Sequence, residues 1–127
     1  PLRDVYKRQS LGCAAHFLLV ARQSPADISG YMAAGRAVQR LWLACASDDI
    51  QFQPEQTPII FADYARKGIR FSSDQAAIAK AEKLRVEFNT LAGEANVTDA
   101  VFAGRVGYGT DARARSLRLP LARLLGA

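Results

Sequence analysis

Only two segments of the sequence, one toward each end, have the length and composition of β-strands. Residues 14–22 form a short apolar run of strand length, and residues 100–108 combine β-forming side chains with glycines. Two strands do not make a stable sheet by themselves. A chain of this kind therefore needs further strands to complete its sheet, and we expect those partner strands to be missing from the sequence.

A long helix is expected after the first strand. Its start is predicted at Ser24, an N-cap residue followed by Pro25 at the first helical position and by Asp27 three residues after the cap. The apolar face recurs at helical spacing and consists of Ala34, Ala37, Val38, Leu41 and Cys45. The helix carries Gly30 and Gly35, each of which costs it about 1 kcal/mol relative to Ala.

Two more helices are expected before the second strand. Residues 50–58 contain two prolines and no helical period, which predicts a loop or an extended segment, and residues 59–67 predict a short helix. A second capping box, Ser72 with Gln75, begins a longer helix that ends at Gly93 as its C-cap. Its apolar face consists of Ala77, Ala81, Leu84, Phe88 and Leu91. The order of elements predicts an α+β domain with one sheet covered by helices.

The first nine residues, PLRDVYKRQ, join no periodic pattern and look like translated sequencing-adaptor DNA. We therefore interpret residues 1–9 as a non-native, adaptor-derived segment and leave them out of the expected fold. Residues 10–127 are then expected to be the C-terminal portion of a single domain whose N-terminal half is lost. A genuine N-terminal arm is the alternative.

Charge is concentrated at the end of an otherwise neutral chain. Residues 10–103 carry nine basic and ten acidic side chains, whereas residues 104–127 carry five arginines against Asp111 alone. This pattern indicates a local anion site rather than a broad face for nucleic acid, and no basic recognition helix or aromatic RNA-binding motif is evident. No apolar run approaches the roughly 18 residues of a membrane-spanning helix, so we expect a cytoplasmic protein with no membrane partner.

Few side chains suggest a metal site or a nucleophile. Cys13 and Cys45 lie outside any CxxC spacing and are interpreted as two small apolar residues in a reducing compartment, although a disulfide stays open. The single histidine, His16, lies in an apolar run and leaves little for a metal site or a catalytic triad.

Three segments together resemble the C-terminal region of nitroreductase-like flavoproteins. Residues 31–44, YMAAGRAVQRLWLA, resemble the long central helix of that family. Residues 50–54, IQFQP, are similar to the segment that passes the isoalloxazine ring, and residues 102–109, FAGRVGYG, resemble the last strand. Residues 115–120, RSLRLP, resemble the basic stretch that contacts the FMN phosphate.

The resemblance implies an FMN-dependent oxidoreductase that passes reducing equivalents from NAD(P)H to a nitroaromatic, quinone or similar acceptor, and that works as a homodimer. It implies phosphate contacts from Arg115, Ser116 and Arg118, because guanidinium groups and a hydroxyl suit a dianion. It also implies that Gln53 and Pro54 approach the flavin edge. No catalytic residue and no metal are expected, because the cofactor performs the hydride chemistry.

The chain also departs from the family. The phosphate motif of the family's N-terminal half, Arg-x-Ser-x-Arg, is not supplied by this sequence, and Gln53-Pro54-Glu55-Gln56 stands where an acidic residue and a glycine are frequent. The chain alone is therefore expected to bind FMN weakly or not at all. The alternative function is a non-catalytic member that binds flavin or another ligand.

Overall fold

The computed structural model describes residues 2–110 and 119–125 and has three strands in one antiparallel sheet. The strands are β1 (Ala15–Val20), β2 (Gln51–Pro54) and β3 (Ala100–Gly107). Their order is β1-β3-β2, so β3 is the central strand and pairs with both others. The predicted α+β class is confirmed, and the sheet has one strand more than the sequence pattern indicates.

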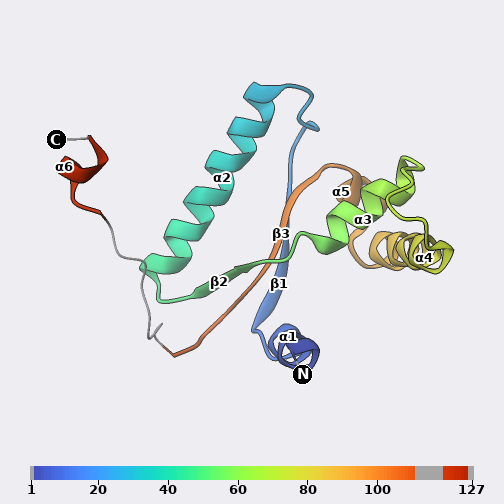
Figure 1. Ribbon diagram of the computed structural model, residues 1–127, viewed down its shortest axis with the longest axis horizontal. Coiled ribbons are helices and arrows are strands. Elements are labelled where there is room, and N and C mark those ends of the chain that lie inside the picture. The colour runs from blue at the N-terminus through green and yellow to red at the C-terminus, as the bar shows by residue number, and fades with distance from the viewer. Residues whose placement is uncertain (1, 111–118, 126–127) are drawn as a thin grey trace.

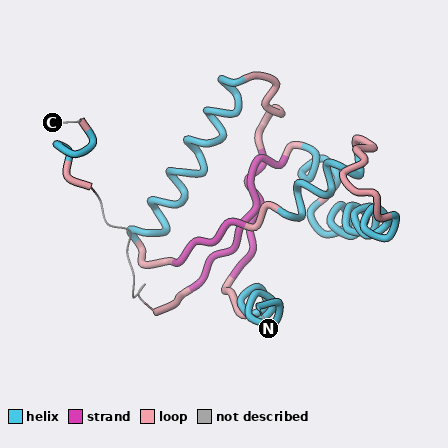
Figure 2. The backbone as a smooth tube through the Cα atoms, in the orientation of Figure 1, coloured by secondary structure: helices cyan, strands magenta, loops and turns pink. Residues whose placement is uncertain are grey.

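Six helices accompany the sheet in the described residues: α1 (Leu2–Leu11), α2 (Ile28–Ser47), α3 (Thr57–Arg66), α4 (Gln75–Ala92), α5 (Glu94–Thr98) and α6 (Leu121–Leu124). Figure 1 shows α2 on one side of the sheet and the group formed by α3, α4 and α5 on the other. Helix α1 lies beside the start of β1 (Figure 2). None of the helices described is long and apolar enough to cross a membrane.

Helix α2 begins later than the sequence predicts. Its N-cap is Asp27, whose backbone is extended and whose carboxylate accepts a hydrogen bond from the Gly30 N–H at 2.8 Å. The predicted cap, Ser24, instead donates its hydroxyl hydrogen to the Asp99 carboxylate, just before β3. Both residues have side chains that cap helices well, and the tertiary contact of Ser24 leaves the capping position to Asp27.

The start of α4 differs in the same way, whereas its end is confirmed. Asp74 caps the helix by accepting a hydrogen bond from the Ala76 N–H. The hydroxyl of Ser72, two residues before Asp74, accepts from the Asp74 N–H. Gly93 closes α4 with a φ of 86°, a left-handed value that favours glycine. The predicted apolar face is buried at Ala81, but Leu91 at its far end is exposed.

Two other segments differ from the sequence interpretation. Residues 51–54 form an edge strand, so the extended alternative for this proline-containing segment is the correct one. Residues 2–11 form α1, which includes most of the segment that the sequence analysis leaves out of the fold. No glycine or proline interrupts these ten residues, so the backbone can be helical without strain.

Aromatic side chains fill the space between α2 and the sheet. Because paired residues of an antiparallel ladder share a face, the register places Phe17, Phe52 and Phe102 on the same side of the three strands. The ring centroids of Phe17 and Phe52 lie 5.2 Å apart, and those of Phe52 and Phe102 lie 5.7 Å apart. Trp42 of α2 stacks on Phe52 at 4.6 Å and so fastens the helix to the sheet.

The core around this cluster is thin. The buried apolar residues of the described chain are mostly small, and no large side chain is fully buried among them. Many large apolar side chains remain exposed on α2, including Ile28, Tyr31, Met32 and Leu43. Burial of apolar area is the main source of stability, so we expect this chain on its own to be only marginally stable.

The crowded position of Gly104 and the open position of Gly35 predict opposite effects for substitution of these two glycines by alanine. A Cβ at Gly104 would lie 2.6 Å from the ring of Phe17 and 3.0 Å from the carbonyl oxygen of Gln53. Phe17 is held by the neighbouring rings, so Gly104→Ala should lower the free energy of unfolding by about 1–3 kcal/mol. A Cβ at Gly35 of α2 meets nothing within 4 Å, so Gly35→Ala should raise it by up to about 1 kcal/mol.

Urea unfolding followed by circular dichroism measures both changes under the same conditions. Gly35→Ala is the matched control because it adds the same methyl group to an open position. Equal stability of Gly104→Ala and the parent chain would show that the three strands are not packed as closely as this register requires.

Candidate functional site

The face of the sheet opposite the aromatic cluster carries polar side chains. The register pairs His16 of β1 with Arg105 of β3, and pairs Arg105 in turn with Gln53 of β2. Side chains of directly paired residues point to the same face. The sheet therefore brings an imidazole, a guanidinium group and an amide into one row across its three strands.

Glu55, which directly follows β2, contacts both Arg105 and His16 of this row. One carboxylate oxygen accepts from Arg105 Nη1 at 2.8 Å, and the other lies 2.9 Å from His16 Nδ1. The backbone N–H of Glu55 also donates to the Ala103 carbonyl, and so does the side-chain amide of Gln56. These bonds fix the position of the carboxylate relative to the central strand.

Arg105 is the buried charge of this site, with 8% of its surface exposed. A buried charge is costly unless a counter-ion and hydrogen bonds satisfy it. Glu55 supplies the counter-ion, and Gln9 of α1 accepts a further hydrogen bond from Nη2 at 3.3 Å. The guanidinium group is therefore compensated within the fold.

Three open clefts adjoin the row of polar side chains. One, of about 700 Å³, is lined by His16 and Glu55 together with apolar residues of α4. Another has a volume of about 470 Å³ and is lined by Gln53, Arg105 and Tyr108 together with Cys13. The third, of about 400 Å³, is lined by Gln53, Pro54, Glu55 and Arg105. Gln53 and Arg105 thus line the last two clefts, which places the polar row within reach of a small ligand.

The structure places Gln53 and Pro54 at the sheet edge but limits what their backbones can offer. The bond from Glu55 N to Ala103 O marks a hydrogen-bonded pair, and such pairs alternate along an antiparallel ladder. Gln53 is therefore in the bonded pair with Arg105, and Pro54 has no N–H. Two groups of this segment are therefore free to contact a flavin edge: the exposed side-chain amide of Gln53 and the carbonyl of Pro54, which points away from the ladder.

The three residues expected to bind phosphate, Arg115, Ser116 and Arg118, lie outside the described residues. Of the expected site, the structure describes Gln53 and Pro54 at the sheet edge, and it places Arg105, Glu55 and His16 near them.

None of these added residues has a predicted role. Arg105 is a charged residue inside a strand-length apolar run, which is a signal of a buried charge, whereas Glu55 stands between Pro54 and Gln56 and gives no such signal. Their meeting depends on strand register, because Glu55 is 39 residues from His16 and 50 residues from Arg105 in the sequence. Periodicity within one strand cannot supply that register.

A separate cavity of about 610 Å³ lies between α2, α3 and the start of β3, and Asp63 is one of its lining residues. Burial alone would raise the pKa of Asp63, but hydrogen bonds and positive charge from Lys67 and Arg66 outweigh burial and hold that pKa below its ordinary value of 3.8. Asp63 is therefore ionised at neutral pH. Across the described residues, no group of three or more His, Cys, Asp or Glu side chains is arranged to hold a metal ion.

The burial of Arg105 predicts that Glu55 contributes more to stability than an exposed carboxylate does. Glu55→Ala leaves the buried guanidinium group without its counter-ion, and the free energy of unfolding should fall by about 2–3 kcal/mol. Glu87 is the matched control, because its side chain is 64% exposed and faces Lys83 at 3.7 Å in α4. Glu87→Ala should change stability by less than about 0.5 kcal/mol.

Urea unfolding of both variants checks this difference. The double variant Glu55→Met, Arg105→Met removes both charges and should recover part of the lost stability. Equal losses in Glu55→Ala and Glu87→Ala would show that the Glu55–Arg105 pair does not hold the sheet.

Comparison of the chain with protein-family models, with curated proteins and with solved structures found no match. The fold and the polar site therefore rest on the residues and contacts described above. The likeness to nitroreductase-like flavoproteins rests on the sequence segments quoted for it, and it enters below as a proposal.

Proposed function

We propose that this chain is part of an FMN-dependent oxidoreductase of the nitroreductase-like kind. In this proposal, FMN accepts reducing equivalents from NAD(P)H and passes them to a nitroaromatic, quinone or similar acceptor. The protein's share is to bind the flavin, to orient it and to tune its electronics.

The observation that carries the proposal is the packing of the segments that resemble this family. Residues 31–44 lie in α2, residues 51–54 form β2, and residues 102–107 lie in β3. Trp42 stacks on Phe52 at 4.6 Å, and Phe52 lies 5.7 Å from Phe102, so all three segments meet at one aromatic cluster. Contact between the three segments supports the proposal.

The residues at the polar face suit a flavin in part. The exposed amide of Gln53 can donate to or accept from the heteroatoms at a flavin edge, and it lines two clefts. The phosphate contacts are assigned from sequence to Arg115, Ser116 and Arg118. When bound, FMN supplies the hydride chemistry, and no side chain of this chain needs to act as general acid or base.

The exposed apolar face of α2 supports a homodimer as part of this proposal. Tyr31, Met32 and Leu43 of this helix are more than half exposed, with the exposed side chains of Arg36 and Arg40 between them. Large apolar side chains exposed on one helix are surface that a partner chain can cover. A second copy that covers α2 would bury this surface and add to the thin core.

The second candidate function is a non-catalytic protein that binds flavin or another ligand. It is favoured by the position of Glu55, whose carboxylate is engaged by Arg105 and His16. A carboxylate held in this way serves the fold and is not free to adjust the flavin. Oxidation of NADH or NADPH in the presence of FMN and a benzoquinone separates the two functions, since flavin binding without turnover favours this second one.

Binding of FMN and of riboflavin tests the proposed phosphate and ring contacts separately. Arg118→Ala and Arg115→Ala should each weaken FMN binding by about 10- to 100-fold, the loss typical of a charged hydrogen bond. Neither should alter riboflavin binding, because riboflavin lacks the phosphate. Gln53→Ala should weaken both flavins alike by about 2- to 10-fold. Flavin fluorescence titration up to millimolar concentrations measures the affinity of the parent chain and of each variant for both flavins.

Arg123→Ala is the matched control, because Arg123 lies in α6 beyond the expected phosphate motif. It lowers the net charge by the same amount and should leave FMN binding within about twofold, as expected of a distant surface charge. Equal losses in Arg118→Ala and Arg123→Ala would reduce the effect to general electrostatics. Equal affinity of the parent chain for FMN and riboflavin would exclude the phosphate site.

A further inference from the structure

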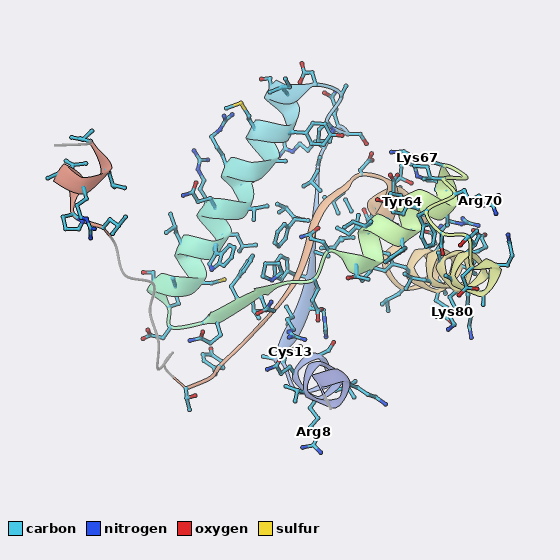
Figure 3. All side chains as sticks on the ribbon, viewed as in Figure 1. Arg8, Cys13, Tyr64, Lys67, Arg70 and Lys80 are labelled. Carbon is cyan, nitrogen blue, oxygen red and sulfur yellow. The ribbon has the colours of Figure 1, made fainter. Side chains whose placement is uncertain are left out.

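A cysteine, a histidine and a glutamate form a hydrogen-bonded chain at the edge of the polar face. Cys13 lies between α1 and β1, at the lower end of β1 in Figure 3. Its Sγ is 3.2 Å from His16 Nε2, and His16 Nδ1 is 2.9 Å from a carboxylate oxygen of Glu55. A nucleophile, a base within hydrogen-bond reach and a third group that orients the base are the parts of an activated thiol.

Acceptor atoms lie beside both ring nitrogens of His16. In the neutral tautomer that carries its hydrogen on Nδ1, the ring donates to the Glu55 carboxylate and Nε2 presents a lone pair toward Cys13. The Ser10 carbonyl lies 3.0 Å from Nε2 and 3.2 Å from Cys13 Sγ. Once the ring takes up a second proton, that carbonyl can accept a hydrogen bond from Nε2–H and stabilise the imidazolium.

The position of Glu55 is itself fixed. Arg105 holds its other oxygen at 2.8 Å, and the Glu55 backbone is bonded to the central strand. Glu55 is therefore a positioning residue for His16. Arg8 lines the same cleft of about 470 Å³ as Cys13, and its positive charge favours an anion there.

We propose that Cys13 is a reactive thiol that hydroperoxides oxidise to a sulfenic acid, with His16 as its base. His16 Nε2 takes the thiol proton while the sulfur attacks one oxygen of the peroxide. The S–O bond forms, the O–O bond breaks, and the proton passes from the imidazolium to the leaving hydroxide. Sulfur is oxidised by two electrons, and the balance is Cys–SH + H₂O₂ → Cys–SOH + H₂O.

The surroundings of the two cysteines support this assignment to Cys13. Cys13 is partly exposed on an open cleft, whereas Cys45 of α2 is 8% exposed and packs at the aromatic side of the sheet. Susceptibility to oxidation follows thiolate character and exposure. Cys45 is the other cysteine of the chain and is buried, so an external thiol reduces the sulfenic acid of Cys13.

Hydrogen peroxide added to the reduced full chain, with dimedone as the sulfenic acid trap, measures the rate at each cysteine by peptide mass spectrometry. We expect Cys13 to react faster than Cys45, and at least about tenfold faster in the folded chain than in the chain unfolded by urea, as proton transfer to a positioned base predicts. This comparison needs no variant, so it does not depend on how well a substitution folds. It also needs no flavin, so its result is independent of the function proposed above.

Variants then test the role of each partner. His16→Gln keeps a hydrogen-bonding side chain but cannot take the proton, so the rate at Cys13 should fall to that of the unfolded chain, and one ionisation should vanish from the pH profile of the rate. Glu55→Gln should give an intermediate rate, and Glu87→Gln, the exposed control in α4, should leave the rate unchanged. A Cys13 rate in the folded chain no higher than in the unfolded chain, or an unchanged rate in folded His16→Gln, would overturn the proposal.

Discussion

The carboxylate of Glu55 joins all three strands of the sheet. It follows β2, accepts a hydrogen bond from Arg105 on β3 and contacts His16 on β1. Its value lies in specificity as much as in stability, because the attraction within a buried ion pair is offset by the cost of removing both charges from water. A shift of one residue in either ladder would turn Arg105 or its partner to the aromatic face. The pair therefore penalises wrong registers strongly, even where its net contribution to stability is small.

The two faces of the sheet use different physics to hold their neighbours. On one face, the rings of Phe17, Phe52 and Phe102 receive Trp42 and so position α2 through burial and aromatic contact. On the other, Arg105 pairs with Glu55 beside open clefts whose walls are both polar and apolar. Apolar burial fixes the scaffold on one face, and the exposed amide of Gln53 on the other face remains available for a ligand. This division places the chemistry on the face away from α2.

The parts of the fold that sequence alone could predict are those in which one periodicity extends over many residues. The central and first strands and helices α2 and α4 follow from such patterns. Strand β2 has only four residues, QFQP, and two alternations around a proline do not distinguish a strand from a loop. The start of α2 was predicted at Ser24 and lies at Asp27, because the contact of Ser24 with Asp99 links residues 75 positions apart.

The candidate site was less accessible from sequence for the same reason. Gln53 and Pro54 were identified from a resemblance, but the bonded position of Gln53 in the ladder follows from a register that no local pattern encodes. His16 was set aside because it lies in an apolar run, and its neighbours in that run do point away from it on alternate faces. Its partners Cys13 and Glu55 come from a turn and from a different strand. Charged residues placed inside strand-length apolar runs were the available signal.

The two proposed activities meet at one cleft, and this restricts how they can coexist. Gln53, Arg105 and Cys13 line the same volume of about 470 Å³. A ligand that contacts the amide of Gln53 from this cleft therefore occupies space onto which the Cys13 thiol also opens. Oxidation of Cys13 in turn adds an oxygen atom to the wall that the ligand would contact. Ligand binding and oxidation of Cys13 therefore disfavour each other. By thermodynamic linkage, the factor by which oxidation weakens ligand binding is also the factor by which the bound ligand favours the reduced thiol.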